Sequence, residues 1–190
     1  MRNRPESTFI VAEAGVNHNG ERDLAFQMVE IAAESGADAI KFQTFNAKKV
    51  VTLLAPKAAY QQKSTGTGQT QLEMLANLQL DYETHHALKH YSEQKGLQFM
   101  STAFDSQSLV FLVHDLGLDI LKIPSGEITN GPLLLEFART GRNLILSTGM
   151  STLEEVRIAL AVIAFGVTSN MEPSVDAFTS AFESEKGQKA

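Results

Sequence analysis

The chain has 190 residues, 43% of them apolar and 20% charged, with a formal net charge of −6 and no cysteine. This composition indicates a soluble globular protein, and no apolar run approaches the roughly 18 residues that span a bilayer. The missing cysteines exclude disulfides and thiolate chemistry, and the acidic balance without a basic stripe argues against a nucleic-acid partner. The first apolar run is too short for a signal-peptide core, so the expected location is the cytoplasm.

A repeated pattern divides the chain into units, in which a glycine ends a helix and a strand starts about three residues later. The glycines are Gly36, Gly96, Gly117 and Gly141. Together with an opening strand at 8–12, the pattern predicts five strands. The helices that follow them are expected at 22–35, 82–95, 106–116, 131–139 and 153–165, and a short further helix is expected at 175–183.

Repeated strand–helix units with short connections predict a parallel sheet with right-handed crossovers. A polar residue stands at the end of each strand, as in a barrel, whereas a doubly wound sheet concentrates its function at one switch point. No G-x-G-x-x-G or Walker-type loop occurs. The prediction is an α/β fold of the (β/α)8 TIM-barrel type, with about the first five βα units present. Because no sixth strand is recognisable after Gly166, we expect residues 1–190 to be the N-terminal portion of a larger barrel enzyme.

One connection is unusually long. It runs from Phe45 to Thr70 and contains the pair Lys48-Lys49 and the stretch K-S-T-G-T-G at 63–68. Loops of this length inside a compact domain are usually functional or disordered. Two interpretations stay open: a cover over the strand ends, or an insertion without catalytic importance.

Two lysines occupy equivalent places, five residues after the glycine of their unit. They are Lys41 and Lys122. Burying an unpaired ammonium group is costly, so each lysine is expected to face a negative group. Together they would clamp a phosphate or a carboxylate. The alternative is that they are bonded to internal carboxylates such as Glu13 and Glu127.

Hydroxyl groups stand at three strand ends, one of which also carries Lys122. Thr102 ends the third strand, Ser125 with Gly126 follows the fourth as a small anion nest, and Ser147 ends the fifth. A single hydroxyl in such a place is most often a turn or cap residue. The combination of hydroxyls with two lysines is a better match to a phosphate pocket.

The histidines are less informative. His18 lies in the first strand–helix loop, where a functional role is open. The others fall on predicted outer helices, where a solvated or capping role is expected: His85, His86, His90 and His114. No pair with metal-ligand spacing is placed at the strand ends, so no complete metal site is expected in this chain.

Four motifs, in order along the chain, resemble the sialic acid synthase family. They are A-E-A-G-V-N-H-N-G at 12–20, I-K-F-Q-T at 40–44, K-I-P-S-G-E at 122–127 and L-S-T-G-M at 146–150. The family includes N-acetylneuraminate synthase and the related legionaminic and pseudaminic acid synthases. The resemblance extends from about Phe9 to Gly166.

The resemblance implies condensation of phosphoenolpyruvate with an N-acetylated hexosamine, of the N-acetylmannosamine type, to give a nine-carbon 2-keto sugar acid and phosphate. It implies Mn²⁺ or Mg²⁺ in the complete enzyme, a homodimer, and an antifreeze-like C-terminal domain that is absent here. The metal-binding histidines and a sugar-contacting arginine would lie in regions this chain lacks, so we expect the chain alone to be inactive.

The resemblance also implies roles for individual residues. Phosphoenolpyruvate would be bound by Lys41, Thr102, Lys122, Ser125 and Ser147, and the sugar would face Gln43 and Glu127. Glu13 would be the catalytic residue beside the reacting carbon, where it could transfer a proton or position the attacking water.

Two other functions stay open. A 3-deoxy-octulosonate or 3-deoxy-heptulosonate phosphate-type synthase binds a phosphorylated sugar and would need additional arginines at the strand ends. The arginines of this chain that come into question fall in helices or helix–strand turns instead: Arg22, Arg139, Arg142 and Arg157. The other alternative is a non-catalytic barrel remnant that binds an anion or a partner protein through an open sheet edge.

Overall fold

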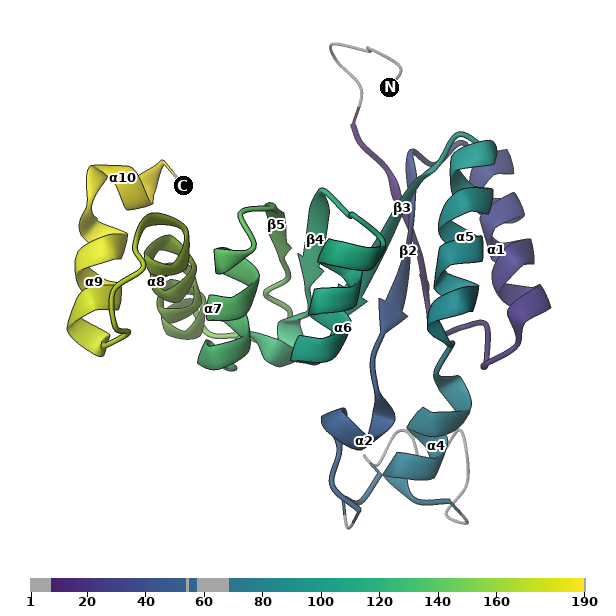
Figure 1. Cartoon of the computed structure of the whole chain (residues 1–190), viewed down its shortest axis with the longest axis horizontal. Coiled ribbons are helices and arrows are strands. Elements are labelled where there is room, and N and C mark those ends of the chain that lie inside the picture. Colours follow the sequence, from purple (N-terminus) through teal and green to yellow (C-terminus); the bar gives the residue numbers. More distant parts are fainter. Residues whose placement is uncertain (1–7, 54, 58–68, 190) are drawn as a thin grey trace. The chain divides into compact units, whose positions relative to one another are not determined.

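The structure is a computed structural model that describes residues 8–53, 55–57 and 69–189. The chain divides into two compact units, Met1–Ser101 and Thr102–Ala190. Five parallel strands follow one another in the sheet order β1-β2-β3-β4-β5, with helices between them (Figure 1). The five predicted parallel strands are therefore confirmed. None of the helices within the described ranges is both long and apolar enough to cross a membrane.

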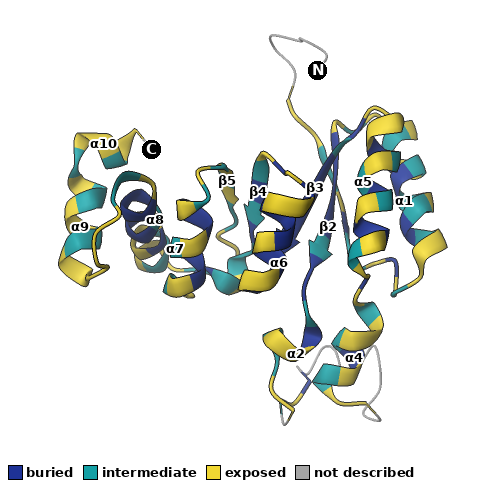
Figure 2. Cartoon of the chain, in the orientation of Figure 1, coloured by how far each residue is buried: buried dark blue, intermediate teal, exposed yellow. Residues whose placement is uncertain are grey.

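The first unit contains three strands and the helices that connect them. Helix α1 packs against α5, β1 and β2, and Figure 2 shows buried residues along β2 and β3. The Phe42 and Phe99 rings stack in this core with their centroids 5.7 Å apart. The elements are β1 (Val11–Gly15), α1 (Arg22–Glu34), β2 (Ala39–Thr44), α2 (Ala47–Val50), α4 (Gln71–Leu78), α5 (Tyr82–Gln94) and β3 (Gln98–Ala103), whose last two residues belong to the second unit.

The second unit is dominated by helices. Helix α7 packs on α8, which in turn packs on α9 through an edge-to-face contact between Phe165 and Phe178, with centroids 5.1 Å apart. The elements are α6 (Ser106–Val110), a π-helical turn (Phe111–Asp115), β4 (Ile120–Ile123), a 3-10 turn (Ser125–Glu127), α7 (Gly131–Arg139), β5 (Asn143–Leu146), α8 (Leu153–Thr168), α9 (Val175–Glu183) and α10 (Glu185–Gln188).

The structure corrects the bounds of the opening strand. Strand β1 begins at Val11 rather than at residue 8, and it ends at Gly15. The backbone N–H of Ile10 donates to the Asp38 carboxylate at 2.8 Å, and its carbonyl accepts the N–H groups of Asp38 and Ala39. These bonds hold the chain before the strand begins. Glu13 is therefore the central residue of β1 and does not follow its end.

The predicted long connection after β2 contains more helix than expected. Helices α2 and α4 lie within or directly after it, and α4 begins with a capping box between Thr70 and Glu73. The T-x-x-E pattern at 70–73 is the sequence signal for this helix. Residues 54 and 58–68 lie outside the described residues, so the two interpretations of this connection stay predictions.

Gly20 lies where the chain passes close to helix α4. Its φ angle is +80°, and a Cβ atom built on it would lie 2.0 Å from the carbonyl oxygen of Asn77. Gly36 has a similar φ of +78° but no atom within 4 Å of the corresponding position. Both glycines have a left-handed backbone, and only Gly20 has no room for a side chain.

Substituting each glycine by alanine separates these two effects. Gly36→Ala should lower the free energy of unfolding by about 1–2 kcal/mol, the cost of a left-handed alanine. Gly20→Ala should cost at least about 2 kcal/mol more, because the Asn77 carbonyl must move. Urea unfolding of the two variants measures the difference, and equal losses would contradict the close contact.

Two buried histidines lie in the first unit. His18 and His85 are both fully buried. Burial lowers the pKa of His18 below its ordinary value, and the neighbouring His85 lowers it further. Burial also lowers the pKa of His85, although contacts of its ring with the Asp81 and Gln43 carbonyls act in the opposite direction. The expected solvated or capping position of His85 is wrong, because His85 shares the buried face of α5 with Leu88.

The buried histidines predict a pH-dependent stability. Their pKa values are lower in the folded than in the unfolded chain, so unfolding takes up protons below about pH 6.5. The stabilisation is complete above this value and decreases as the pH falls through it, by at most about 1.4 kcal/mol per pH unit for each histidine. Urea unfolding between about pH 8 and about pH 5 measures the slope.

One variant controls this experiment. His18→Asn should flatten the slope, because it removes one of the two buried imidazole groups. Carboxyl groups with pKa values lowered by hydrogen bonds act at lower pH: Glu30, Glu73, Asp81 and Glu155. A free energy of unfolding that stays constant between about pH 8 and about pH 5 would contradict the lowered pKa values of His18 and His85.

Candidate active site

An ion pair joins β1 and β2 in the first unit. The strand register places Glu13 opposite Lys41, so both side chains leave the sheet on the same face. Lys41 Nζ lies 2.8 Å from Glu13 Oε2, and the Lys41 side chain is 7% exposed against 59% for Glu13. The lysine charge is thus compensated inside the unit while the carboxylate keeps contact with solvent. In this structure Lys41 is bonded to an internal carboxylate, as one of the two open interpretations expects.

Gln43 lies two residues beyond Lys41 on β2. Its side-chain Nε2 lies 3.7 Å from the place that a Cβ on Gly15 would take, so the amide lies beside the end of β1. Its backbone carbonyl lies 3.3 Å from His85 Nε2. Glu13, Lys41 and Gln43 therefore occupy neighbouring positions of β1 and β2.

A second group of polar side chains lies in the second unit. Lys122 Nζ donates to the Ser147 hydroxyl on the β5 side and, at 3.2 Å, to the carbonyl of Ile123. The N–H of Ser147 donates to the same carbonyl at 3.1 Å. Thr102, the register partner of Lys122 on β3, is buried. Lysine and hydroxyls at successive strand ends can bind an anion through charge-assisted hydrogen bonds.

Ser125 lies near the loop that follows Ser147. A Cβ on Gly149 would lie 3.5 Å from the Ser125 hydroxyl, so Ser125 faces the loop between β5 and α8. In that loop Met150 has a φ of +59° and an exposed side chain. A left-handed backbone is unusual for a long side chain and indicates a tightly determined turn. The turn fixes the segment directly after Ser147.

Glu127 has a different neighbour. Its Oε2 accepts a hydrogen bond from the side-chain nitrogen of Asn130 at 2.8 Å. Asn130 in turn caps α7 by accepting the N–H of Leu133 at 3.3 Å. Glu127 thus orients the residue that starts α7, and its predicted contact with a sugar stays a prediction.

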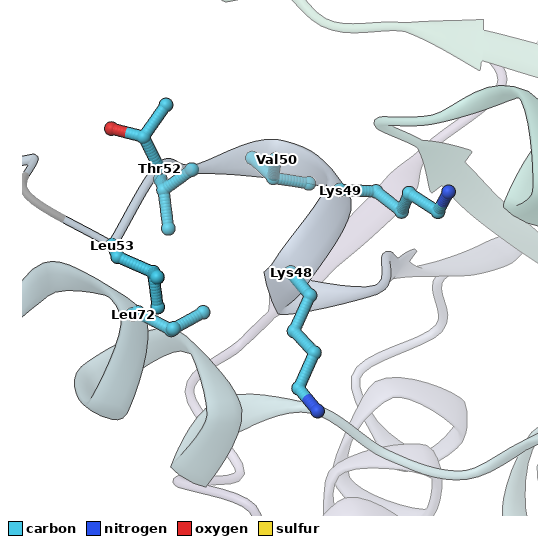
Figure 3. A pocket seen from close by; sticks show the side chains of 7 residues that line it. Lys48, Lys49, Val50, Thr52, Leu53 and Leu72 are labelled. Atoms are coloured by element: carbon cyan, nitrogen blue, oxygen red, sulfur yellow. The ribbon is translucent and has the colours of Figure 1, made fainter.

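A surface cavity lies between α2 and α4 in the first unit (Figure 3). Its volume is about 470 Å³, and its lining residues include Lys48, Lys49, Leu53 and Leu72. The two lysine side chains point in different directions in Figure 3, so they do not form a clamp for one anion. None of the predicted site residues lines this cavity.

The described residues do not provide a set of side-chain ligands for a metal ion. Among residues 8–53, 55–57 and 69–189, no group of three or more His, Asp or Glu side chains is arranged to hold one. His18 and His85, the buried histidines, contact a backbone N–H and two backbone carbonyls. The metal that the family resemblance implies therefore has no ligand set among these residues.

His85 is the residue near the site that the sequence interpretation missed. Its two ring nitrogens contact the carbonyls of Asp81 at 2.9 Å and Gln43 at 3.3 Å, so it joins the start of α5 to the end of β2. The signal was its helical spacing from the buried Leu88 and Ser92, which places it on the sheet-facing side of α5.

Comparisons with known proteins identify the family of the chain. Residues 28–183 match the model of the NeuB family. An N,N'-diacetyllegionaminic acid synthase of Campylobacter jejuni is 49% identical over 158 residues, which are 83% of this chain and 47% of that protein. The corresponding synthase of Legionella pneumophila is 51% identical over 155 residues, which are 82% of this chain and 43% of that protein. The chain thus spans less than half the length of these relatives.

A solved structure extends the likeness to the fold. The N-acetylneuraminic acid (sialic acid) synthetase of Leptospira borgpetersenii, crystallised with citrate, is 28% identical with a TM-score of 0.72. The match covers 99% of this chain and 65% of that chain. Together with the order of the parallel strands, it confirms the predicted α/β fold of the TIM-barrel type. Because the family model covers most of the chain and both curated relatives agree with it, the chain belongs to the NeuB family.

Proposed function

We propose that the whole protein condenses phosphoenolpyruvate with an N-acetylated amino sugar, releasing phosphate and forming a 2-keto sugar acid. The observation that carries the proposal is the hydrogen bond from the Lys122 ammonium group to the Ser147 hydroxyl at neighbouring strand ends. In a member of the NeuB family, such a pair is a suitable receptor for one anionic group of phosphoenolpyruvate. Because the chain spans less than half of its relatives, the reaction is proposed for the whole protein.

Phosphoenolpyruvate carries a phosphate and a carboxylate, so its binding calls for more than one cation. Lys122 would bind one group with help from the hydroxyls of Thr102, Ser125 and Ser147. Lys41 would bind the other, and its ion pair with Glu13 would then rearrange to include the ligand. Charge-assisted hydrogen bonds of this kind are stronger than neutral ones, which suits a small and highly charged substrate.

In the proposed reaction, C3 of phosphoenolpyruvate forms a bond to the aldehyde carbon of the sugar, and the aldehyde oxygen takes a proton. Positive character develops at C2, where water adds, and the C2–O bond to phosphate then breaks to leave the keto group. The partly exposed Glu13 carboxylate would stabilise the charge at C2 or accept the proton of the attacking water. Gln43 and Glu127 would face the sugar.

The divalent metal stays part of the proposal for the whole protein only. No step is assigned to it, because the described residues provide no group of ligands. The proposal also includes a homodimer in the cytoplasm. The homodimer follows from the family resemblance, and the location is proposed from the composition without cysteine.

The curated relatives favour a particular kind of acceptor. Two of them, 49% and 51% identical, are named N,N'-diacetyllegionaminic acid synthases. Phosphoenolpyruvate contributes no acetamido group, so a diacetylated product requires an acceptor that already carries two. We therefore propose a diacetamido hexose as the acceptor, with N-acetylmannosamine as the second candidate and a phosphorylated sugar, as in 3-deoxy-octulosonate-type synthases, as the third.

Phosphoenolpyruvate binding to the 190-residue chain tests the proposed receptor. Lys122→Met should weaken the affinity at least about tenfold, which corresponds to about 1.4 kcal/mol of binding free energy. Ser147→Ala should weaken it less, because it removes a neutral partner and leaves the charge. Titration calorimetry measures both effects.

Lys48→Met is the matched control for this binding experiment, since Lys48 lines the separate cavity between α2 and α4. Its affinity should stay within about twofold of the unsubstituted chain. If Lys122→Met binds phosphoenolpyruvate as tightly as Lys48→Met does, the receptor lies elsewhere.

Phosphate release tests the reaction itself. With phosphoenolpyruvate, Mn²⁺ and each of the three candidate sugars, the complete protein should release phosphate fastest with the diacetamido hexose. The 190-residue chain alone should release none, because the metal ligands expected for the family are not among its described residues. Phosphate release by the chain alone would overturn the second expectation, and none from the complete protein with any sugar would overturn the proposed function.

A further inference from the structure

The loop between β1 and α1 is closed by its own hydrogen bonds. Backbone N–H groups of Asn17, Asn19 and Glu21 donate to the carbonyls three residues earlier, at 3.0, 3.0 and 2.8 Å. The N–H of Gly20 is not part of this series and donates to Nδ1 of His18 at 3.0 Å. The imidazole thus adds a side-chain acceptor to the hydrogen bonds of residues 16–20, the segment that directly follows Glu13, Ala14 and Gly15.

This hydrogen bond determines the state of the imidazole. An Nδ1 atom that accepts a hydrogen bond is unprotonated, so the ring is neutral and its proton is on Nε2. Burial and the neighbouring His85 lower the pKa of His18, which keeps the ring in this state at neutral pH. Nδ1 therefore remains an acceptor for the Gly20 N–H.

The ring is held in place from the β2 side. His18 is fully buried, and its ring centroid lies 6.1 Å from that of Phe42, the residue that follows Lys41. Gly20 meets helix α4 on its other side, where no side chain would fit against the Asn77 carbonyl. The loop is thus enclosed between a strand that carries one member of the Glu13–Lys41 pair and a helix.

We infer that His18 is a positioning residue, whose Nδ1 fixes the β1–α1 loop and thereby holds the Glu13 carboxylate in place beside Lys41. The first turn of the loop bonds to Ala14, so a loosened loop frees the residue next to Glu13. The inference rests on the proposed function, in which Glu13 acts at the reacting carbon. His18 itself touches no reacting atom and acts through the loop.

Two variants of His18 distinguish the role of its hydrogen-bond acceptor from that of its ring, because asparagine and leucine have nearly equal size. His18→Asn keeps an acceptor oxygen that can bind the N–H two residues on, as in an Asx turn, whereas His18→Leu removes the acceptor. Both remove Nε2, which finds no hydrogen-bond partner among the described residues. In the 190-residue chain, His18→Leu should speed hydrogen exchange of the Gly20 amide at least about tenfold, and His18→Asn should change it less than about threefold.

The complete protein provides the functional measurement. His18→Leu should lower kcat about tenfold or more with a small change in KM for phosphoenolpyruvate. The reason is that Glu13 is displaced while Lys122 and Ser147, the proposed anion receptor, keep their positions. His18→Asn should keep most of the kcat of the unsubstituted protein, because its side-chain oxygen can still accept the Gly20 N–H. If both variants lose kcat equally while remaining folded, or if His18→Leu keeps both kcat and Gly20 protection, the positioning role through Nδ1 is wrong.

Two further measurements keep the inference testable. If His18→Leu does not fold, the ¹⁵N spectrum of the unsubstituted chain decides, because a protonated Nδ1 of His18 at neutral pH would overturn the inference. If the complete protein releases no phosphate, the proposed function fails, and protection of the Gly20 amide in the two variants still decides whether His18 fixes the loop.

Discussion

An ammonium group is costly to bury without a partner, and this constraint organises the pairing of β1 and β2 in the first unit. Lys41 points from β2 into a position that is almost closed to solvent, and Glu13 compensates its charge from the neighbouring strand. The pairing requires Glu13 to be part of β1, in register with Lys41. The chain turns directly after the strand, which Gly15 allows with its φ of +57°. The position of the catalytic candidate is thus a consequence of burying a lysine.

A lysine ammonium group has different partners in the two units. Lys41 makes an ion pair with a carboxylate, whereas the Lys122 ammonium donates to the Ser147 hydroxyl and a carbonyl. An ion pair must be rearranged when an anion arrives, while a lysine bonded to neutral oxygens can accept the anion as an additional partner. In the proposed function, Lys41 would therefore have to rearrange its pair with Glu13 when an anionic ligand binds, whereas the hydrogen bond from Lys122 to Ser147 involves no carboxylate.

The architecture was predictable because its signals are local. Gly36, Gly96, Gly117 and Gly141 all have positive φ angles in the structure, so the glycine pattern reflects the backbone that ends each helix. The true start of β1 was not predictable from the apolar run, because bonds to the side chain and backbone of Asp38 hold Ile10 outside the strand. Likewise, the burial of His85 depends on the packing of α5, which composition alone does not give. The lysines and hydroxyls could be proposed as site residues because the ends of the predicted strands carry few other polar residues, while their partners in the structure depend on the strand register.

The close approach of Gly20 to Asn77 has a consequence for how such proteins diverge. It joins the loop after β1 to the last turn of α4, a helix that comes more than fifty positions later in the chain. The contact itself sets no limit on the number of residues between β2 and α4, provided that the Asn77 carbonyl returns to the same place. At position 20, by contrast, the Asn77 carbonyl leaves no room for a side chain, so the contact restricts the type of residue there and not the length of the segment between β2 and α4.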